Sequence, residues 1–138
     1  MALKAKNILV TGGAGFIGSH LVDRLVEAGG KVVVVDNLSS GRKENINKKA
    51  KFYQVDVRDS QFGQIIKKEK IEAAFHLAAQ PLVENAYHNP LETLEINIMG
   101  TARILEFCRR EGNLKSIVVV SSDKAYGKSK NLPYTEKS

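Results

Sequence analysis

Apolar residues recur along the chain in short runs that are separated by segments with helical spacing. The runs cover residues 7–10, 32–35, 52–55, 73–78 and 116–120. The valines at 32–35 are uninterrupted, which is typical of a strand buried on both faces of a parallel sheet. Helical patterns cover residues 16–28, 61–68 and 90–110, and in the last of these the positions expected to be buried include Leu91, Leu94, Ile98, Leu105 and Cys108. The alternation predicts an α/β fold with a doubly wound parallel sheet, about five strands in the order 3-2-1-4-5 and right-handed crossovers.

The chain length is compatible with one domain. Its 138 residues can bury a real core but are few for a complete two-domain enzyme. We therefore assign residues 1–138 to a single domain, in which residues 127–138 are a loop or frayed tail because they contain Pro133 and few apolar residues.

The segment at 11–18, TGGAGFIG, lies between the first expected strand and the first expected helix. Gly13, Gly15 and Gly18 satisfy the spacing GxGxxG, and Gly12, Gly15 and Gly18 satisfy GxxGxxG. Glycines there permit a tight turn, close approach of backbone to a pyrophosphate and close packing of helix on sheet. The alternative is a strand, turn and helix without a ligand. The surrounding strand and helix favour a dinucleotide-binding Rossmann fold.

An acidic residue, Asp36, ends the second expected strand, about 20 residues beyond the glycines. We expect its carboxylate to accept both hydroxyl groups of an adenosine ribose. Because a carboxylate repels a 2′-phosphate, NAD is favoured as cofactor over NADP, although Arg42 and Lys43 nearby leave NADP open.

Charge and apolar content restrict the remaining function classes. Lys and Arg number 21 against 15 acidic residues, a formal net charge of +6, which raises the question of nucleic-acid binding. The lysines at 48–51 and 67–70 form short runs without interleaved aromatic residues, so we expect no nucleic-acid partner. No apolar run approaches the roughly 18 residues of a membrane span, and the N-terminal residues do not resemble a signal peptide. We expect no membrane partner and a cytoplasmic location.

The cysteine and the histidines give little support for a metal site. Cys108 is the only cysteine, and His20, His76 and His88 show no ligand spacing with carboxylates. We therefore expect no bound metal.

Further segments extend the pattern beyond the glycine loop. They are DNL at 36–38, DV at 56–57, HLAAQ at 76–80, NIMGT at 97–101 and SSDKAYG at 121–127. Together with the glycine loop they resemble the extended short-chain dehydrogenase/reductase family, which includes nucleotide-sugar epimerases and 4,6-dehydratases. The resemblance covers essentially the whole chain in the order of the family.

The resemblance implies a role for each of these segments in binding NAD. Pyrophosphate would bind the backbone N–H groups of the helix start, the adenosine ribose would bind at the end of the second strand, adenine would lie after the third strand, and the loop after the fourth strand would line the cofactor. The residues implied, in that order, are Phe16 and Ile17, Asp36 and Asn37, Asp56 and Val57, then Leu77, Ala78, Ala79 and Gln80. Asn97 would bond near the nicotinamide end, with a structural role equally open. All these segments lie at or after the carboxyl ends of expected strands, where ligands bind in open α/β sheets.

The triplet Ser122, Asp123 and Lys124 is the candidate catalytic segment. The resemblance implies that Ser122 donates a hydrogen bond to the sugar hydroxyl being oxidised. An acid followed by a second titratable group looks like the 4,6-dehydratases, and with residues 76–83 and 89–93 it looks most like the CDP-glucose 4,6-dehydratases. The alternative for Asp123 and Lys124 is an exposed ion pair after a strand.

These features lead to a functional hypothesis with two alternatives. We expect the NAD-binding domain of a nucleotide-sugar 4,6-dehydratase, which would oxidise the sugar 4-position, eliminate water and return the hydride. The first alternative is an NAD-dependent nucleotide-sugar 4-epimerase, and the second is a non-catalytic NAD-binding or assembly module.

In the family, hydride transfer depends on a Tyr-x-x-x-Lys pair on a later helix. Tyr126 and Lys130 match that spacing but follow Ser122 too closely and lie in an expected loop, so we treat the match as chance. Without the pair and the C-terminal substrate domain, we expect this chain to bind the dinucleotide with little or no turnover. We also expect a homodimer or a missing C-terminal partner segment, because the absent helix would leave Ile104, Leu105 or Phe107 partly uncovered.

Overall fold

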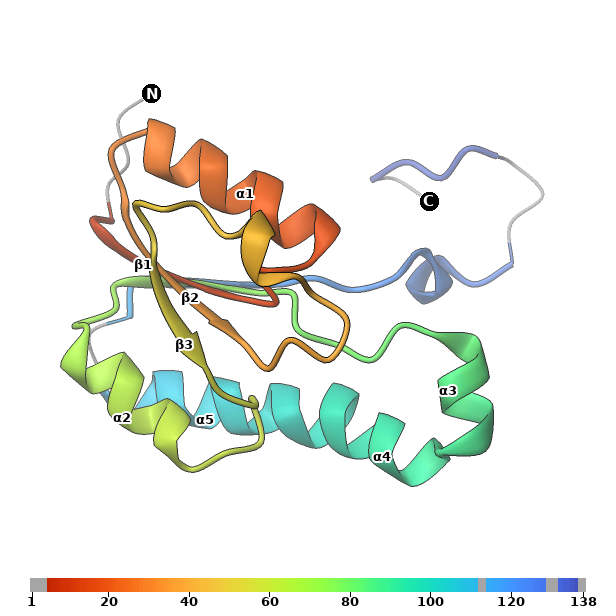
Figure 1. Ribbon diagram of the computed structural model, residues 1–138. Helices are drawn as coiled ribbons and strands as arrows, with labels where there is room; N and C mark the ends of the chain where they lie inside the picture. The colour runs from red at the N-terminus through yellow and green to blue at the C-terminus, as the bar shows by residue number, and fades with distance from the viewer. Residues whose placement is uncertain (1–4, 112–113, 129–131, 137–138) are drawn as a thin grey trace.

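The computed structural model describes residues 5–111, 114–128 and 132–136 of the chain (Figure 1). The strands are β1 (Asn7–Thr11), β2 (Lys31–Asp36), β3 (Lys51–Gln54), β4 (Ala73–His76) and β5 (Ser116–Val119). The α-helices are α1 (Phe16–Glu27), α2 (Gln61–Lys68), α3 (Val83–His88), α4 (Pro90–Leu94) and α5 (Thr101–Glu111). Two 3-10 turns, η1 (Lys43–Asn45) and η3 (Asp123–Tyr126), and one π-helical turn, η2 (Glu95–Gly100), complete the elements of the described residues.

The strands form one parallel sheet in the order β3-β2-β1-β4-β5. The central strand β1 pairs on one side with β2 and on the other with β4, so that Leu9 lies between Val33 and Ala74. The predicted fold class and strand order are confirmed. Since all strands run the same way, the segments that follow β1 to β5 begin at one edge of the sheet, the carboxyl edge.

Two apolar clusters, one on each face of the sheet, explain the uninterrupted valine run. Successive side chains of a strand point to opposite faces. On one face, Leu9 and Val33 pack with α2 and α5, and on the other face Val10 and Val34 pack with α1. Figure 1 shows the corresponding layers, with α1 on one side of the sheet and α2 and α5 on the other. Val10 and Val34 are fully buried, as a central strand covered on both faces requires.

The helical segment after α3 differs from its prediction in two ways: a π turn interrupts the α-helix, and several of its apolar side chains are exposed. It runs from α4 through the π turn η2 into α5, and α3 itself was not predicted. The expectation of burial is right for Cys108 but wrong for four positions, which are exposed: Leu91, Leu94, Ile98 and Leu105. Helical spacing identifies an apolar stripe but not the element that covers it. In the described residues only the part of α5 that faces the sheet is covered.

The expected gap in the cover of α5 is found in part. Leu105 is 42% exposed, and Phe107 is partly buried against the ring of Phe62, with centroids 6.1 Å apart. Ile104, however, is fully buried, so the expectation that it would be uncovered is wrong. Its side chain belongs to the cluster between α5 and the sheet.

Residues 127–138, expected to be a loop or tail, contain neither helix nor strand in the part that the structure describes. Tyr134 returns toward η3, where its hydroxyl donates to the carbonyl of Gly127 at 2.7 Å. Its ring stacks on Tyr126 with centroids 5.4 Å apart. The assignment of one domain to residues 1–138 includes positions outside the described residues and stays a prediction.

Candidate nucleotide-binding site

The loop between β1 and α1 depends on Gly12 for its shape. Gly12 has a φ of +70°, a region that residues with a side chain rarely adopt. A Cβ placed there would lie 2.8 Å from the backbone nitrogen of Ala78. The glycine loop and the loop after β4 therefore meet backbone to backbone, which only glycine permits.

The helix start is open to an anion. Gly15 is the N-cap of α1, and a Cβ built on it would meet only the carbonyl oxygen of Gly12, at 3.3 Å, so space above the helix start is free. Phe16 and Ile17 turn their side chains to solvent, with exposed fractions of 80% and 65%. The first turn of α1 contains no acidic residue. Backbone N–H groups at a helix start and the helix dipole favour a phosphate.

Close packing of α1 on the loop requires Gly18. A Cβ there would overlap the carbonyl oxygen of Gly12 and lie 2.9 Å from the Cα of Gly13. These are backbone atoms, which cannot rotate away. The three glycines 12, 15 and 18 thus match the three steric requirements of a dinucleotide-binding turn.

Asp36, at the end of β2, is buried and already has two partners. Its Oδ2 accepts the N–H of Ala14 at 3.0 Å, and its Oδ1 accepts the N–H of Leu38 at 2.8 Å. The carboxylate therefore connects the glycine loop to the turn after β2. It lies at the carboxyl edge, as the prediction of a ribose-binding acid requires.

Asn37 and Asp56 are brought together at the ends of β2 and β3. The amide of Asn37 donates to Oδ2 of Asp56 at 2.9 Å. Arg58 binds the same carboxylate through Nε, Nη2 and its backbone N–H, each at 2.9 Å. These hydrogen bonds, with Arg58 first, lower the pKa of Asp56 to about 2. Arg58 was not singled out in the sequence, although a cation two residues after an acid in a strand-end loop is a usable signal.

Val57 is buried in the cluster between α2, α5 and the sheet, so its side chain anchors the loop after β3 to the core. Arg58 also lies 3.9 Å from carboxylate oxygens of Glu92 and Glu95. The loop after β3 is thereby connected to the helical segment α4–η2.

The loop after β4 is held by Asn97, a residue of the π turn η2. Oδ1 of Asn97 accepts the N–H of Gln80 at 2.7 Å, and its Nδ2 donates to the carbonyl of Gln80 at 3.0 Å. The side chain of Gln80 in turn bonds Leu82 and Thr93. Both polar atoms of the Asn97 amide are used within the protein, which supports the structural role left open in the sequence. Leu77 and Ala78 are partly buried, whereas Ala79 is exposed.

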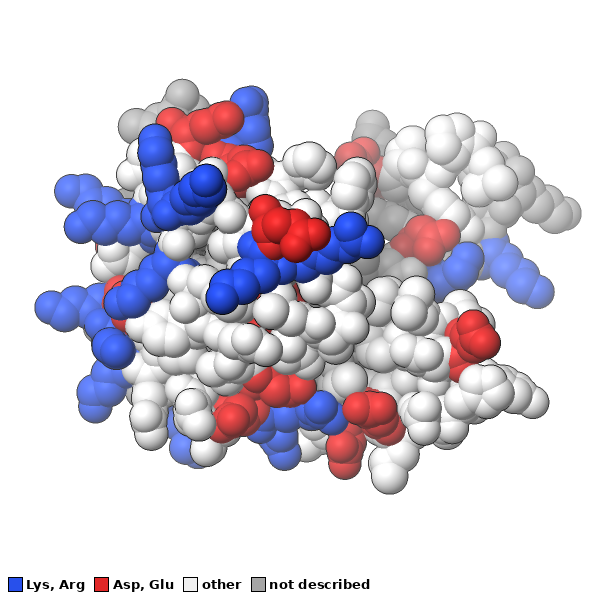
Figure 2. Space-filling model, in the orientation of Figure 1, with Lys and Arg blue, Asp and Glu red and all other residues white. Residues whose placement is uncertain are grey.

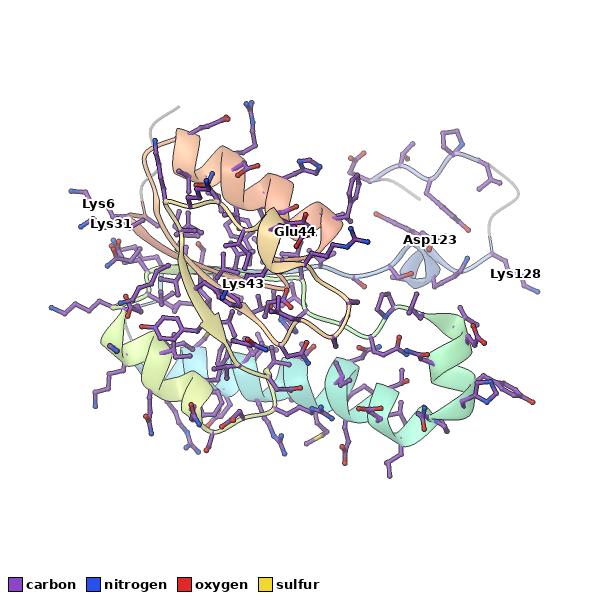
Figure 3. All side chains as sticks on the ribbon, in the orientation of Figure 1. Lys6, Lys31, Lys43, Glu44, Asp123 and Lys128 are labelled. Carbon is purple, nitrogen blue, oxygen red and sulfur yellow. The ribbon has the colours of Figure 1, made fainter. Side chains whose placement is uncertain are left out.

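A groove of about 540 Å³ lies on the outer side of the glycine loop. Arg42 lines it together with Gly15 and Phe16, and its backbone N–H donates to the carbonyl of Ala14 at 3.1 Å. Figures 2 and 3 show that many of the basic side chains lie away from this groove, around Lys6 and Lys31 at the amino ends of the strands. Much of the positive charge thus lies away from the carboxyl edge.

The candidate catalytic triplet lies beyond β5 and is exposed (Figure 3). The hydroxyl of Ser122 donates to Oδ1 of Asp123 at 3.1 Å and accepts the backbone N–H of Lys124 at 3.3 Å. Nζ of Lys124 lies 3.4 Å from Oδ2 of Asp123. These contacts, with that of Ser122 first, lower the pKa of Asp123. The interpretation of the Tyr126 and Lys130 spacing as a chance match stays a prediction, because Lys130 lies outside the described residues.

Two further properties concern the described residues only. No three His, Cys, Asp or Glu side chains among them come together in a way that could hold a metal ion. None of the helices within the described ranges combines the length and apolar character needed to cross a membrane.

The chain matches known proteins over almost its full length. Residues 9–138 match the family model described as GDP-mannose 4,6 dehydratase. A Methanocaldococcus jannaschii protein named "Putative UDP-glucose 4-epimerase" is 44% identical over 129 residues, which are 94% of this chain and 42% of that protein. A Lactobacillus helveticus UDP-glucose 4-epimerase is 42% identical over 130 residues, covering 94% and 39%.

Solved structures agree with these matches. A Thermotoga maritima UDP-glucose 4-epimerase with UDP-glucose superposes with a TM-score of 0.85 at 44% identity, over 91% of this chain and 41% of that one. A Thermus thermophilus UDP-glucose 4-epimerase in complex with NAD gives a TM-score of 0.74 at 40% identity, over 78% and 36%. The chain thus spans about two fifths of the length of these relatives. It belongs to the extended short-chain dehydrogenase/reductase family of NAD-dependent nucleotide-sugar epimerases and dehydratases.

Proposed function

We propose that this chain is the NAD-binding part of a nucleotide-sugar 4-epimerase. The observation that carries the proposal is 44% identity over 94% of the chain with a protein named as a UDP-glucose 4-epimerase. Matches of this kind favour the epimerase, which the sequence left as an alternative, over the 4,6-dehydratase. The description of the family model as a GDP-mannose 4,6 dehydratase keeps the dehydratase as second candidate.

The carboxyl edge offers groups that fit NAD. The cradle above Gly15, which a side chain would partly fill, accommodates the pyrophosphate against the N–H groups of Phe16 and Ile17. Asp36 would bind the adenosine ribose, and the loop at 77–80 would line the nicotinamide half. When bound, NAD supplies a reversible hydride acceptor for the sugar 4-position.

Residues of the chain would position the sugar rather than carry out the whole reaction. Ser122 would donate to the sugar 4-hydroxyl after exchanging its present partner, Asp123, for substrate. The exposed Asp123 and Lys124 would face a substrate of nucleotide-sugar type. The Tyr-x-x-x-Lys pair that the resemblance implies for proton removal is not assigned to this chain, so we propose dinucleotide binding with little turnover by the chain alone.

The test uses the longest polypeptide that contains this chain, incubated with UDP-glucose and NAD. A 4-epimerase interconverts UDP-glucose and its 4-epimer without losing mass, whereas a dehydratase yields a product lighter by one water, so mass spectrometry and sugar analysis separate the two. In Asp123→Asn and Lys124→Ala variants, loss of dehydration with retained oxidation would support the dehydratase instead. A polypeptide that binds NAD but converts neither way would favour the non-catalytic module.

For the partner of this chain we propose the two candidates expected from the sequence, a second copy of the chain or a C-terminal partner segment. Leu91, Leu94 and Ile98 are 69%, 52% and 58% exposed along α4 and η2. An apolar surface of this kind favours association. A second copy of the chain, in a homodimer, or a C-terminal partner segment would each cover it.

A further inference from the structure

A chain of side-chain hydrogen bonds crosses the sheet directly beneath the carboxyl edge. Nδ1 of His76, at the end of β4, lies 2.7 Å from the hydroxyl of Thr11, at the end of β1. Its Nε2 lies 3.0 Å from the hydroxyl of Thr101, the first residue of α5. Thr11 and His76 are 1% and 3% exposed. The imidazole therefore bridges β1 and the helical segment without access to solvent.

The partners of the two threonines determine where the imidazole proton lies. The hydroxyl of Thr101 donates its single hydrogen to the carbonyl of Asn97 at 2.7 Å, so it can only accept from His76. Nε2 must then carry the proton, and Nδ1 must accept the hydrogen of the Thr11 hydroxyl. A neutral imidazole has one donor and one acceptor nitrogen, and both are used. Burial supports this neutral form, because it lowers the pKa of His76 to about 4.

The two ends of this network hold the two loops proposed to bind NAD. At one end, the oxygen of Thr11 accepts the N–H groups of Leu77 and Ala78, both at 3.2 Å. Thr11 also directly precedes Gly12, whose backbone touches Ala78.

At the other end, the carbonyl that accepts from Thr101 belongs to Asn97. The side-chain amide of Asn97 holds both backbone polar groups of Gln80. His76 therefore connects the hydrogen bonds that hold the start of the loop at 77–80 with those that hold its end.

We propose that His76 is a positioning residue for the dinucleotide: protonated on Nε2, it sets the position of the loop at 77–80 relative to the glycine loop through Thr11 and Thr101. It acts through these neighbours and does not touch the cofactor. This inference rests on the proposed NAD site, since the loops that it positions are the ones assigned to NAD.

A matched pair of substitutions at Thr101 tests the proposal. Thr101→Val keeps the shape of the side chain but removes both the acceptor of the imidazole N–H and the donor to the carbonyl of Asn97. Thr101→Ser keeps the hydroxyl that makes both contacts. We expect Thr101→Val to raise the dissociation constant for NAD about tenfold, because neither His76 nor Asn97 is then held by residue 101, and Thr101→Ser to keep it within about threefold of the original. Isothermal titration calorimetry measures both.

Two further measurements separate positioning from general destabilisation. Ile104→Val, on the same helix but outside the network, weakens the core and is expected to leave NAD affinity unchanged. Nitrogen-15 NMR of the imidazole reports the tautomer, which we expect to be the Nε2–H form in the original chain and mixed in Thr101→Val.

Equal NAD affinity in the original chain and Thr101→Val would refute the positioning role. So would an Nδ1–H tautomer in the original chain, or a loss of affinity in Ile104→Val equal to that in Thr101→Val. Absence of NAD binding by the folded original chain is a different result, because it overturns the proposed cofactor site and this inference with it.

Discussion

Alanine substitutions at Gly18 and Gly15 distinguish a glycine required for packing from one that faces the ligand. In Gly18→Ala the new methyl group overlaps the carbonyl oxygen of Gly12 and meets further backbone atoms at 2.8 and 2.9 Å. Alanine improves helix propensity by about 1 kcal/mol, but overpacking costs roughly 1–3 kcal/mol and rigid backbone favours the upper end. We expect a net loss of about 2 kcal/mol in the free energy of unfolding, a fall of roughly 8 °C in Tm.

Gly15→Ala is expected to behave in the opposite way. Its φ of −76° and ψ of 175° suit any residue, and the added methyl meets only the carbonyl of Gly12, at 3.3 Å. A weaker N-cap and a less flexible unfolded chain nearly cancel, so the free energy of unfolding changes by less than about 1 kcal/mol. The methyl occupies the approach of the pyrophosphate, so NAD affinity falls at least about tenfold, or roughly 1.4 kcal/mol.

The assay combines thermal unfolding followed by circular dichroism with calorimetric titration of NAD. Gly29→Ala is the control, because its φ of +86° brings backbone strain while no atom lies within 4 Å of the new methyl. This variant loses about 1–2 kcal/mol of stability and binds NAD normally. Gly15→Ala binding NAD as tightly as the original chain, or losing as much stability as Gly18→Ala, would refute the assignment of the cradle to pyrophosphate.

Four further predictions concern the acid, the histidine, the triplet and the exposed helix. Asp36→Asn retains only one oxygen for the two N–H groups that the carboxylate accepts, so the free energy of unfolding in urea falls by about 1–3 kcal/mol and calorimetry detects weaker NAD binding. The pKa of His76 is lowered from 6.5 to about 4, so the unfolded chain takes up the proton first and stability falls as pH decreases through that interval. Urea unfolding near pH 7 and near pH 5 should differ by about 2 kcal/mol from this group, and no loss would contradict the buried neutral imidazole. Asp123→Asn removes an exposed ion pair, so stability changes by less than about 0.5 kcal/mol while turnover of the longest polypeptide falls, and equal turnover would exclude the acid from the reaction. Ile98→Glu places a charge on the exposed apolar helix and should reduce self-association in sedimentation experiments without lowering Tm, whereas unchanged sedimentation of an associating chain would place the interface elsewhere.

The sheet was predictable because its information is local. The four valines at 32–35 identify a strand covered on both faces, and the helical segments between strands require parallel crossovers. With the glycine loop after the first strand, these constraints leave few arrangements other than the observed order. Strand ends differ from the predictions by one or two residues, as at Thr11, which extends β1 toward the glycine loop.

The helical segment at 90–111 was less predictable because its exposure depends on what covers it. Leu94 and Ile98 have the spacing of a buried stripe, yet more than half of the surface of each is exposed among the described residues. The π turn is also invisible to periodicity. An additional residue in one turn changes the direction of the side chains, and here it accompanies the orientation of Asn97 toward Gln80.

Asp36 and Asp56 look equivalent in the sequence, since each ends or follows a strand at the carboxyl edge, but their hydrogen bonds separate them. A carboxylate has about four acceptor sites. Asp56 fills four with Arg58 and Asn37, so an adenine amino group could bind it only by replacing one of these donors. Asp36 uses two for the N–H groups of Ala14 and Leu38, which leaves two, the number that a pair of ribose hydroxyls requires. Asp36 therefore retains acceptor capacity for the cofactor, whereas Asp56 is better explained as a structural residue that connects the turn after β2, through Asn37, to Arg58 in the loop after β3.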